Sequence, residues 1–155
     1  MTDDDFAARA AAQDPPPGFR PMRFYDGFIS GNGPLFMAHA DDGSVRLGCR
    51  IMPHMCNPMG VAHGGWVATL CDVAMGVGTR LDHPELAGNF LLTVTMSVDY
   101  LQGPREGSWV EARVRLLRRT KRLVFADALL ESEGQLIART SGVFRIGPTA
   151  PSMDY

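Results

Sequence analysis

The chain has 155 residues, 45% hydrophobic and 21% charged, which is enough for one domain with a real core and too few for two ordinary ones. The formal net charge of -2 provides no positive field to attract nucleic acid or an anionic membrane. The first residues, MTDDDFAARA, lack the apolar run of a secretory signal, and no later stretch is an uninterrupted membrane span. We therefore expect a cytoplasmic protein with neither nucleic acid nor membrane as a partner.

Three thiols and four imidazoles are the candidate metal ligands. The sequence has too few cysteines for a disulfide scaffold, no CxxC pair and no familiar zinc-ligand spacing. We expect reduced thiols and no metal. The side chains concerned are Cys49, Cys56, Cys71, His39, His54, His63 and His83.

The first 33 residues form an arm that combines an Ala-rich stretch with the turn-prone runs PPPG and GNGP. We expect a short helix or loose arm followed by irregular structure, which either covers a sheet edge or is a flexible tail. Two strands, 35–39 and 45–52, then form a hairpin around the turn signal Asp41-Asp42-Gly43. In the second strand apolar and polar residues alternate, which is typical of a sheet with one buried face.

Residues 64 to about 81 change to a helical pattern in which apolar side chains cover every side of the projection. A helix that is apolar all round is a buried one. It is too short and too rich in glycine for a membrane span, and its Asp72 would be costly in lipid. The pattern predicts the central helix of the domain.

Four strands follow the helix, and their alternation predicts a meander. Their expected ranges are 92–100, 110–116, 123–131 and 135–146. The whole order predicts an α+β domain with one long antiparallel sheet, which buries a single apolar helix only by curling around it. We expect an N-terminal arm over 1–33, the domain over 34–147 and a loose tail over 148–155.

The loop that enters the helix, Asn57 to Trp66, is the most informative segment. Free backbone N–H groups and the positive end of the helix dipole lie beside it, so it is suited to stabilise an oxyanion. Gly64 and Gly65 allow close approach, and the Gly64 N–H is placed to donate to a carbonyl oxygen. The alternative is that both glycines only let the helix pack tightly against the sheet.

Asp72 stands on the same helix, as the only residue between His63 and Arg80 that is charged at neutral pH. A buried carboxylate costs several kcal/mol unless it is compensated, and active sites use such carboxylates as bases or nucleophiles. The alternative is an Asp bonded to nearby Ser or Thr hydroxyls or emerging at a surface. Asp72 follows Gly64 by eight residues, which places the two roughly 12 Å apart along a helix axis. If both act on the same carbonyl group, one of them must therefore come from an antiparallel neighbouring subunit.

The run Asn57-Pro58-x-Gly60-x-x-His63-Gly64-Gly65, followed by Asp72, resembles the phenylacetate-degradation (PaaI-like) branch of the hotdog-fold acyl-CoA thioesterases. The likeness covers roughly residues 35–146. It implies a hotdog fold, a long curved antiparallel sheet wrapped around one central helix. It also implies acyl-CoA as the substrate, no cofactor, and a homodimer or a homotetramer made of two dimers.

The resemblance also implies roles for single residues. Gly64 donates its N–H to the thioester carbonyl, and Asp72 acts as nucleophile or general base. Asn57 orients water or substrate, His63 polarises the carbonyl or braces the loop, and Thr93 helps to hold water.

Substrate contacts are expected at a basic hairpin turn and around an acyl pocket. The turn, Arg118, Arg119, Lys121 and Arg122, supplies positive charge for the phosphates of CoA, although such a turn is often only solvated. Gly65 is expected to approach the substrate. Trp66, Met59, Leu91 and Met96 are candidates for the acyl pocket or plain core residues.

Two other functions are compatible with a hotdog fold. An acyl-CoA hydratase usually pairs an Asp with a His in a differently spaced motif, which this chain lacks. A non-catalytic acyl-CoA-binding module would have no reason to bury Asp72. The sequence does not reveal the acyl group, the choice between dimer and tetramer, or the exact role of Asp72.

Overall fold

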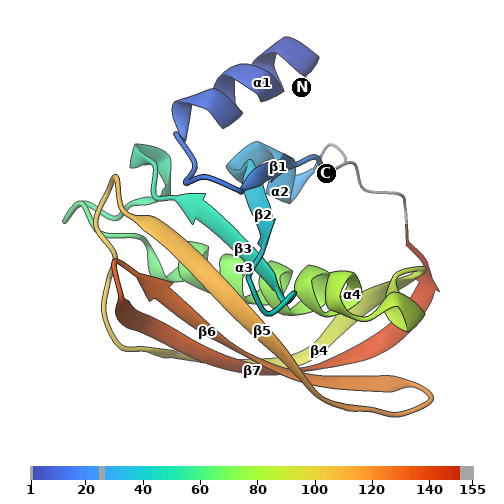
Figure 1. Ribbon diagram of the computed structural model, residues 1–155. Coiled ribbons are helices and arrows are strands. Elements are labelled where there is room, and N and C mark those ends of the chain that lie inside the picture. The colour runs from blue at the N-terminus through green and yellow to red at the C-terminus, as the bar shows by residue number, and fades with distance from the viewer. Residues whose placement is uncertain (1, 25–26, 151–155) are drawn as a thin grey trace.

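The computed structural model describes residues 2–24 and 27–150, so residues 151–155 of the expected tail lie outside the described part. A seven-stranded antiparallel sheet curls around one long helical run (Figure 1). The strand order is β1-β2-β3-β5-β6-β7-β4, and within the described residues the sheet stays open, with β1 and β4 at its edges. The α+β architecture predicted from the sequence is confirmed.

The six strands that the sequence predicts begin and end close to the expected positions, whereas the three-residue β1 lies where irregular structure was expected. Turns with positive φ join them, at Gly43 (φ 82°) between β2 and β3, and at Glu133 and Gly134 (φ 51° and 75°) between β6 and β7. These hairpins are therefore confirmed. The strands are β1 Arg20–Met22, β2 Leu35–His39, β3 Val45–Arg50, β4 Asn89–Tyr100, β5 Trp109–Arg119, β6 Leu123–Ser132 and β7 Gln135–Thr149.

The expected meander of four strands is correct for β5, β6 and β7 and wrong for β4, which pairs with β7 and not with β5. After β4 the chain is tied to the loop before the helix: the Ala62 N–H donates to the Pro104 carbonyl, and Val61 bridges to Arg105. These contacts carry residues 101–108 across one end of the curled sheet, so that β5 starts beside β3 instead of beside β4.

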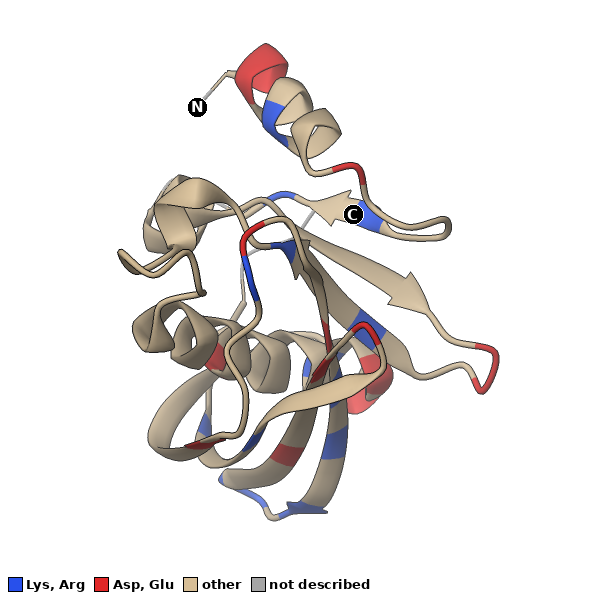
Figure 2. Ribbon diagram, turned by 90° about the vertical axis from the view of Figure 1, so that its left-hand side faces the viewer, with Lys and Arg blue, Asp and Glu red and all other residues tan. Residues whose placement is uncertain are grey.

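The central helical run extends from α3 (Gly64–Val73) through a π-helical turn (Ala74–Gly78) to α4 (Thr79–Asp82), which confirms the predicted helix. Figure 2 shows it almost without charged residues, whereas acidic and basic residues mix along the strands. Short 3-10 turns occupy Pro53–Met55 and Pro84–Leu86. No helix in the described part of the chain is long and apolar enough to cross a membrane.

The sheet buries one side of this helix and leaves the other half-exposed. The buried stripe includes Trp66, Leu70, Cys71, Ala74 and Met75, which are at most 6% exposed. The opposite stripe, Ala68, Thr69, Asp72, Val73 and Val77, keeps contact with solvent. The expectation of burial on every side is therefore wrong for a single chain, because an open sheet reaches only part of the helix circumference.

A β-bulge in β4 changes which side chains face the helix. The register with β7 shifts between Thr93 and Thr95, and Thr93 lies opposite the buried Phe144. Thr93 therefore points toward the helix, whereas Val94 is 56% exposed. The strict alternation from residue 92 to 100 that the sequence predicts is interrupted at this point.

The N-terminal segment lies against the domain through specific polar contacts. Helix α1 (Asp3–Ala12) is capped by Thr2, β1 pairs with β2, and the short α2 (Phe28–Asn32) follows. Arg9 donates to the carbonyls of Ser30, Gly31 and Gly33. The buried Gln13 donates from Nε2 to the Pro34 carbonyl and accepts from the Arg50 N–H. Figure 1 shows α1 standing away from the concave face of the sheet.

Candidate active site

The loop before α3 is shaped by the side chain of Asn57. Its Oδ1 accepts from the Met59 N–H at 2.9 Å and from the Val61 N–H at 3.4 Å, and its backbone N–H donates to the Val61 carbonyl. Gly60 adopts φ 70° at the tip of this turn. Among the described residues none accepts a hydrogen bond from the Asn57 Nδ2, and the side chain is half-exposed.

His63 is the N-cap of α3. Its Nδ1 accepts from the Gly65 N–H at 2.9 Å, so in the neutral ring the proton is assigned to Nε2. A Cβ on Gly65 would lie 3.0 Å from this Nδ1, so any side chain there, alanine included, would crowd the cap. The geometry fits the bracing role, because one ring nitrogen is already occupied by the loop.

Gly64 occupies the first position of the helix, and no described residue accepts a hydrogen bond from its N–H. Its carbonyl accepts from the Tyr100 hydroxyl at 3.1 Å, which fixes the peptide beside the end of β4. A free N–H at a helix N-terminus is a ready donor for an oxygen that gains negative charge. Sequence reasoning missed Tyr100, because its position at the end of a strand gives no sign of contact with residue 64.

Asp72 and Thr93 are brought together: the Thr93 hydroxyl donates to Asp72 Oδ1 over 2.6 Å. The carboxylate is half-buried on the open side of α3, so the severe cost of full burial does not arise. One of its oxygens accepts from Thr93, while no described residue donates a hydrogen bond to Oδ2. A carboxylate held in this way is chemically suited to act as an oriented base or nucleophile.

The neighbouring thiols are unsuited to act as nucleophiles. Burial raises the pKa of the Cys71 thiol to about 12, with the adjacent Asp72 carboxylate as a minor contribution in the same direction. Burial also raises the pKa of Cys49 to about 12. Both thiols therefore stay protonated at neutral pH. Within the described residues, no three His, Cys, Asp or Glu side chains converge into a metal-binding group.

A cavity of about 430 Å³ opens beside Asp72 and Thr93. Of the four residues expected around an acyl group, Leu91 lines it, whereas Trp66 is buried in the core and Met59 is 79% exposed. Met96 lines a separate small hollow on the sheet. The sequence did not reveal that residues of the N-terminal segment, including Phe28, reach this cavity.

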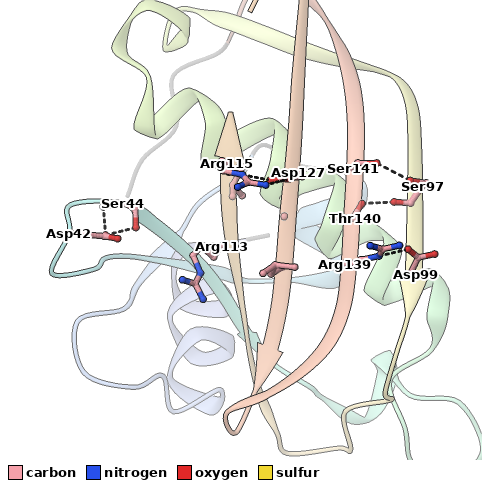
Figure 3. A pocket seen from close by; sticks show the side chains of 13 residues that line it. Asp42, Ser44, Ser97, Asp99, Arg113, Arg115, Asp127, Arg139, Thr140 and Ser141 are labelled. Atoms are coloured by element: carbon pink, nitrogen blue, oxygen red, sulfur yellow. Dashed lines mark hydrogen bonds and ion pairs between the residues drawn. The ribbon is translucent and has the colours of Figure 1, made fainter. Parts of the chain in front are cut away.

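A larger hollow of about 760 Å³ lies on the sheet and contains none of the expected site residues (Figure 3). Four of its charged side chains form two pairs, Arg115 with Asp127 and Arg139 with Asp99, both at 2.6 Å, and the other two, Asp42 and Arg113, have opposite signs. Because these charges offset one another across neighbouring strands, the hollow provides no excess charge for an anionic ligand.

The basic turn comprises the end of β5, with Arg118 and Arg119, and the connection to β6, with Lys121 and Arg122, and all four side chains are exposed. The Thr120 hydroxyl oxygen accepts from the Leu123 N–H at 2.9 Å and fixes the turn. The four cations are therefore presented to solvent on a defined backbone.

Known proteins match this chain in sequence and in fold. The model of the thioesterase superfamily matches residues 59–138. A Pseudomonas aeruginosa protein named "Putative esterase PA0474" is 32% identical over 131 residues, which cover 84% of this chain and 96% of that protein.

Two solved structures share the fold. The first is the phenylacetic acid degradation protein PaaI from Thermus thermophilus, solved as a mutant, with 24% identity and a TM-score of 0.64 over 78% of this chain and 99% of that chain. A Streptococcus mutans protein bound to acetyl CoA has 20% identity and a TM-score of 0.64, over 83% of this chain and 95% of that chain. The hotdog architecture expected from the sequence is thereby confirmed.

Proposed function

Because the chain belongs to the thioesterase superfamily and is a thioester hydrolase, we propose that it releases CoA from acyl-CoA at a site that two subunits build together. One observation carries this proposal. The Gly64 N–H lacks an acceptor among the described residues, and the Asp72 carboxylate is oriented by Thr93. Eight helical residues separate the two groups, roughly 12 Å along the axis. Each chain thus holds two half-sites, one at Gly64 and one at Asp72. The two half-sites of one chain are too far apart to act on the same carbonyl group.

The proposed reaction starts with the thioester carbonyl oxygen at the Gly64 N–H. Asp72 either attacks the carbonyl carbon or removes a proton from the attacking water, and negative charge develops on the oxygen beside the helix N-terminus. The carbon–sulfur bond then breaks and CoA leaves as a thiolate. If water attacked, the acyl group is already the free acid; if Asp72 attacked, a water molecule hydrolyses the anhydride between Asp72 and the acyl group, which releases the acid and restores the carboxylate. Asn57 offers its Nδ2 donors to water or substrate, and His63 keeps the loop in shape.

Strand β4 suggests how two subunits assemble. It is an edge strand of 12 residues that touches both half-sites, through Thr93 near Asp72 and through Tyr100 near Gly64. Antiparallel pairing of two β4 edges, with Thr93 of one copy opposite Tyr100 of the other, brings each Asp72 toward the other copy's Gly64. Two-fold symmetry then produces two equivalent sites, and a tetramer is a pair of such dimers.

The proposed CoA contacts involve the basic turn. Arg118, Arg119, Lys121 and Arg122 are exposed and concentrated, and guanidinium groups are matched to phosphate oxygens. The acetyl CoA bound by the Streptococcus mutans protein supports CoA as the carrier group, because that protein shares the fold.

The experiment that tests the shared site is complementation between two inactive variants. Gly64→Pro removes the N–H, and proline is accepted at the first position of a helix when the preceding residue is extended, as His63 is (φ -62°, ψ 136°). Asp72→Asn removes the carboxylate. When the two variants are co-expressed, half of the dimers in a random mixture contain one chain of each kind, and each mixed dimer has one intact site of two. We therefore expect about a quarter of native CoA release. A different affinity tag on each variant identifies the mixed dimers.

The outcome separates shared sites from sites within one chain. If Gly64 and Asp72 of one chain served the same carbonyl, mixed dimers would remain as inactive as either variant alone. The double variant Gly64→Pro/Asp72→Asn, co-expressed with native chain, is the matched control for subunit exchange. Failure of the native protein to release CoA from any acyl-CoA would reject the proposed function itself.

A further inference from the structure

The cavity beside Asp72 has walls from three parts of the chain. The half-exposed side of the helical run contributes Val73 and Val77 next to Asp72, and the sheet contributes Leu91 and Phe144. Its volume of about 430 Å³ lies within the range of small-molecule sites, which is roughly 300–1,000 Å³. An apolar cavity that meets a carboxylate at one side is suited to hold an apolar group whose polar end lies at that carboxylate.

The third wall comes from the N-terminal segment and consists of Phe24, Phe28 and Ile29, here called the apolar roof. Phe24 and Ile29 are half-buried against the core, whereas Phe28 is 68% exposed at the edge of the cavity. Phe90, 44% exposed, also reaches the lining. When an apolar ligand covers exposed aromatic rings beside a cavity, apolar surface is removed from water, and this burial stabilises the complex.

The roof is fixed to the domain by the contacts of α1. Arg9 holds the end of α2 through three carbonyls, those of Ser30, Gly31 and Gly33. Gln13, 1% exposed, connects the same segment to Pro34 and to Arg50 in β3. A wall held by this many specific hydrogen bonds has a defined position and limits the space below it.

Building on the proposed function, we propose that the apolar roof is the specificity-determining wall of the acyl site. The acyl group lies in the cavity between the roof and the helix, with its carbonyl at Asp72. The accepted group is uncharged and apolar, aromatic or medium-chain, because the lining is mostly hydrocarbon and its two charged side chains, Asp72 and Arg80, have opposite signs. Arg80 also reaches the lining, with its Nη2 donating to the Ala87 carbonyl.

The test compares acyl selectivity in the native protein and in Phe28→Ala. The kcat/KM is measured for acetyl-, butyryl-, hexanoyl-, phenylacetyl-, palmitoyl- and glutaryl-CoA. We expect the native protein to prefer hexanoyl- and phenylacetyl-CoA over acetyl- and glutaryl-CoA. Phe28→Ala should lower kcat/KM about tenfold for the two preferred esters and less than about twofold for acetyl-CoA. Phe28→Leu should restore most of the loss.

Phe6→Ala is the matched control, because Phe6 belongs to the same segment and packs under the Arg23 guanidinium, 5.5 Å from the ring centroid, outside the cavity. It should leave the acyl profile unchanged. A second measurement, calorimetric binding of the non-hydrolysable thioether S-hexyl-CoA, tests the roof without turnover. Phe28→Ala should raise the Kd for S-hexyl-CoA about tenfold more than it raises the Kd for free CoA, which has no acyl group to contact the roof.

The results separate failure of the roof from failure of the proposed function. An unchanged acyl profile and unchanged S-hexyl-CoA binding in Phe28→Ala would overturn the role of the roof while leaving hydrolysis intact. A preference for glutaryl-CoA over hexanoyl-CoA would overturn the apolar acyl class. Absence of turnover in the native protein, with roof-dependent binding of S-hexyl-CoA, would reject hydrolysis and retain the acyl site.

Discussion

The two half-sites on the central helix are built in different ways. At the Gly64 end, the loop turn of Asn57 and the cap of His63 lie within nine residues of one another, and only Tyr100 comes from elsewhere. At Asp72, the partners come from β4, β7 and the N-terminal segment. The oxyanion donor is thus a local product of the loop sequence, whereas the surroundings of the carboxylate depend on the whole fold.

The largest effect is expected when the half-site at Asp72 loses the charge of its carboxylate. Asp72→Asn keeps an oxygen that accepts from Thr93 but removes the base or nucleophile, so kcat should fall by about 10²- to 10⁴-fold. Steady-state CoA release measures this. Asp82→Asn is the control, because Asp82 belongs to the same helical run and its Oδ1 accepts from the Val45 N–H. Equal losses in both variants would show that Asp72 has no special role.

The half-site at Gly64 is tested by removing one hydrogen-bond donor, the backbone N–H. Gly64→Pro should lower kcat by about 10²- to 10³-fold, the usual cost of losing an oxyanion donor. Gly64→Ala retains the N–H, and its Cβ would meet the Tyr100 ring at 3.6 Å, an ordinary contact. We therefore expect Gly64→Ala to retain most activity. If alanine is as harmful as proline, space and not the N–H governs this position.

The contact that ties the carboxylate to the sheet should have the smallest effect. Thr93→Val removes the hydroxyl that donates to Asp72 at 2.6 Å, and a hydrogen bond to a charged group contributes about 1.5–3 kcal/mol. We expect kcat to fall by about 10- to 100-fold, with Thr93→Ser close to native. Stopped-flow CoA release on both variants measures this difference, and similar rates in Val and native proteins would contradict it.

These differences explain which parts could be predicted from the sequence. Alternation identified β2, β3 and the long strands, and the glycine-rich loop with Asp72 indicated the two half-sites, because both signals are local. The pairing of β4 with β7 could not be predicted, since it depends on how residues 101–108 attach to the loop. The bulge that turns Thr93 inward left no mark in the strand pattern.

The N-terminal segment was the least predictable part. Its PPPG and GNGP runs indicate turns, but nothing in them shows that Arg9 and Gln13 attach it to the domain. The carbonyl and N–H partners of these side chains lie more than 20 residues away in the chain. Likewise, Phe24 and Phe28 read as ordinary apolar residues until folding places them at the cavity.

The protonated thiols also determine how the protein responds to oxidants. Burial raises the pKa of Cys56 as well as those of Cys49 and Cys71. Peroxide and disulfide reagents react with thiolates, so the two deeply buried side chains, Cys49 and Cys71, should oxidise slowly. The leaving thiol of the product is fully exposed in solution and ionises normally. Electrophiles that trap free thiols should therefore consume the released product long before they modify Cys49 or Cys71.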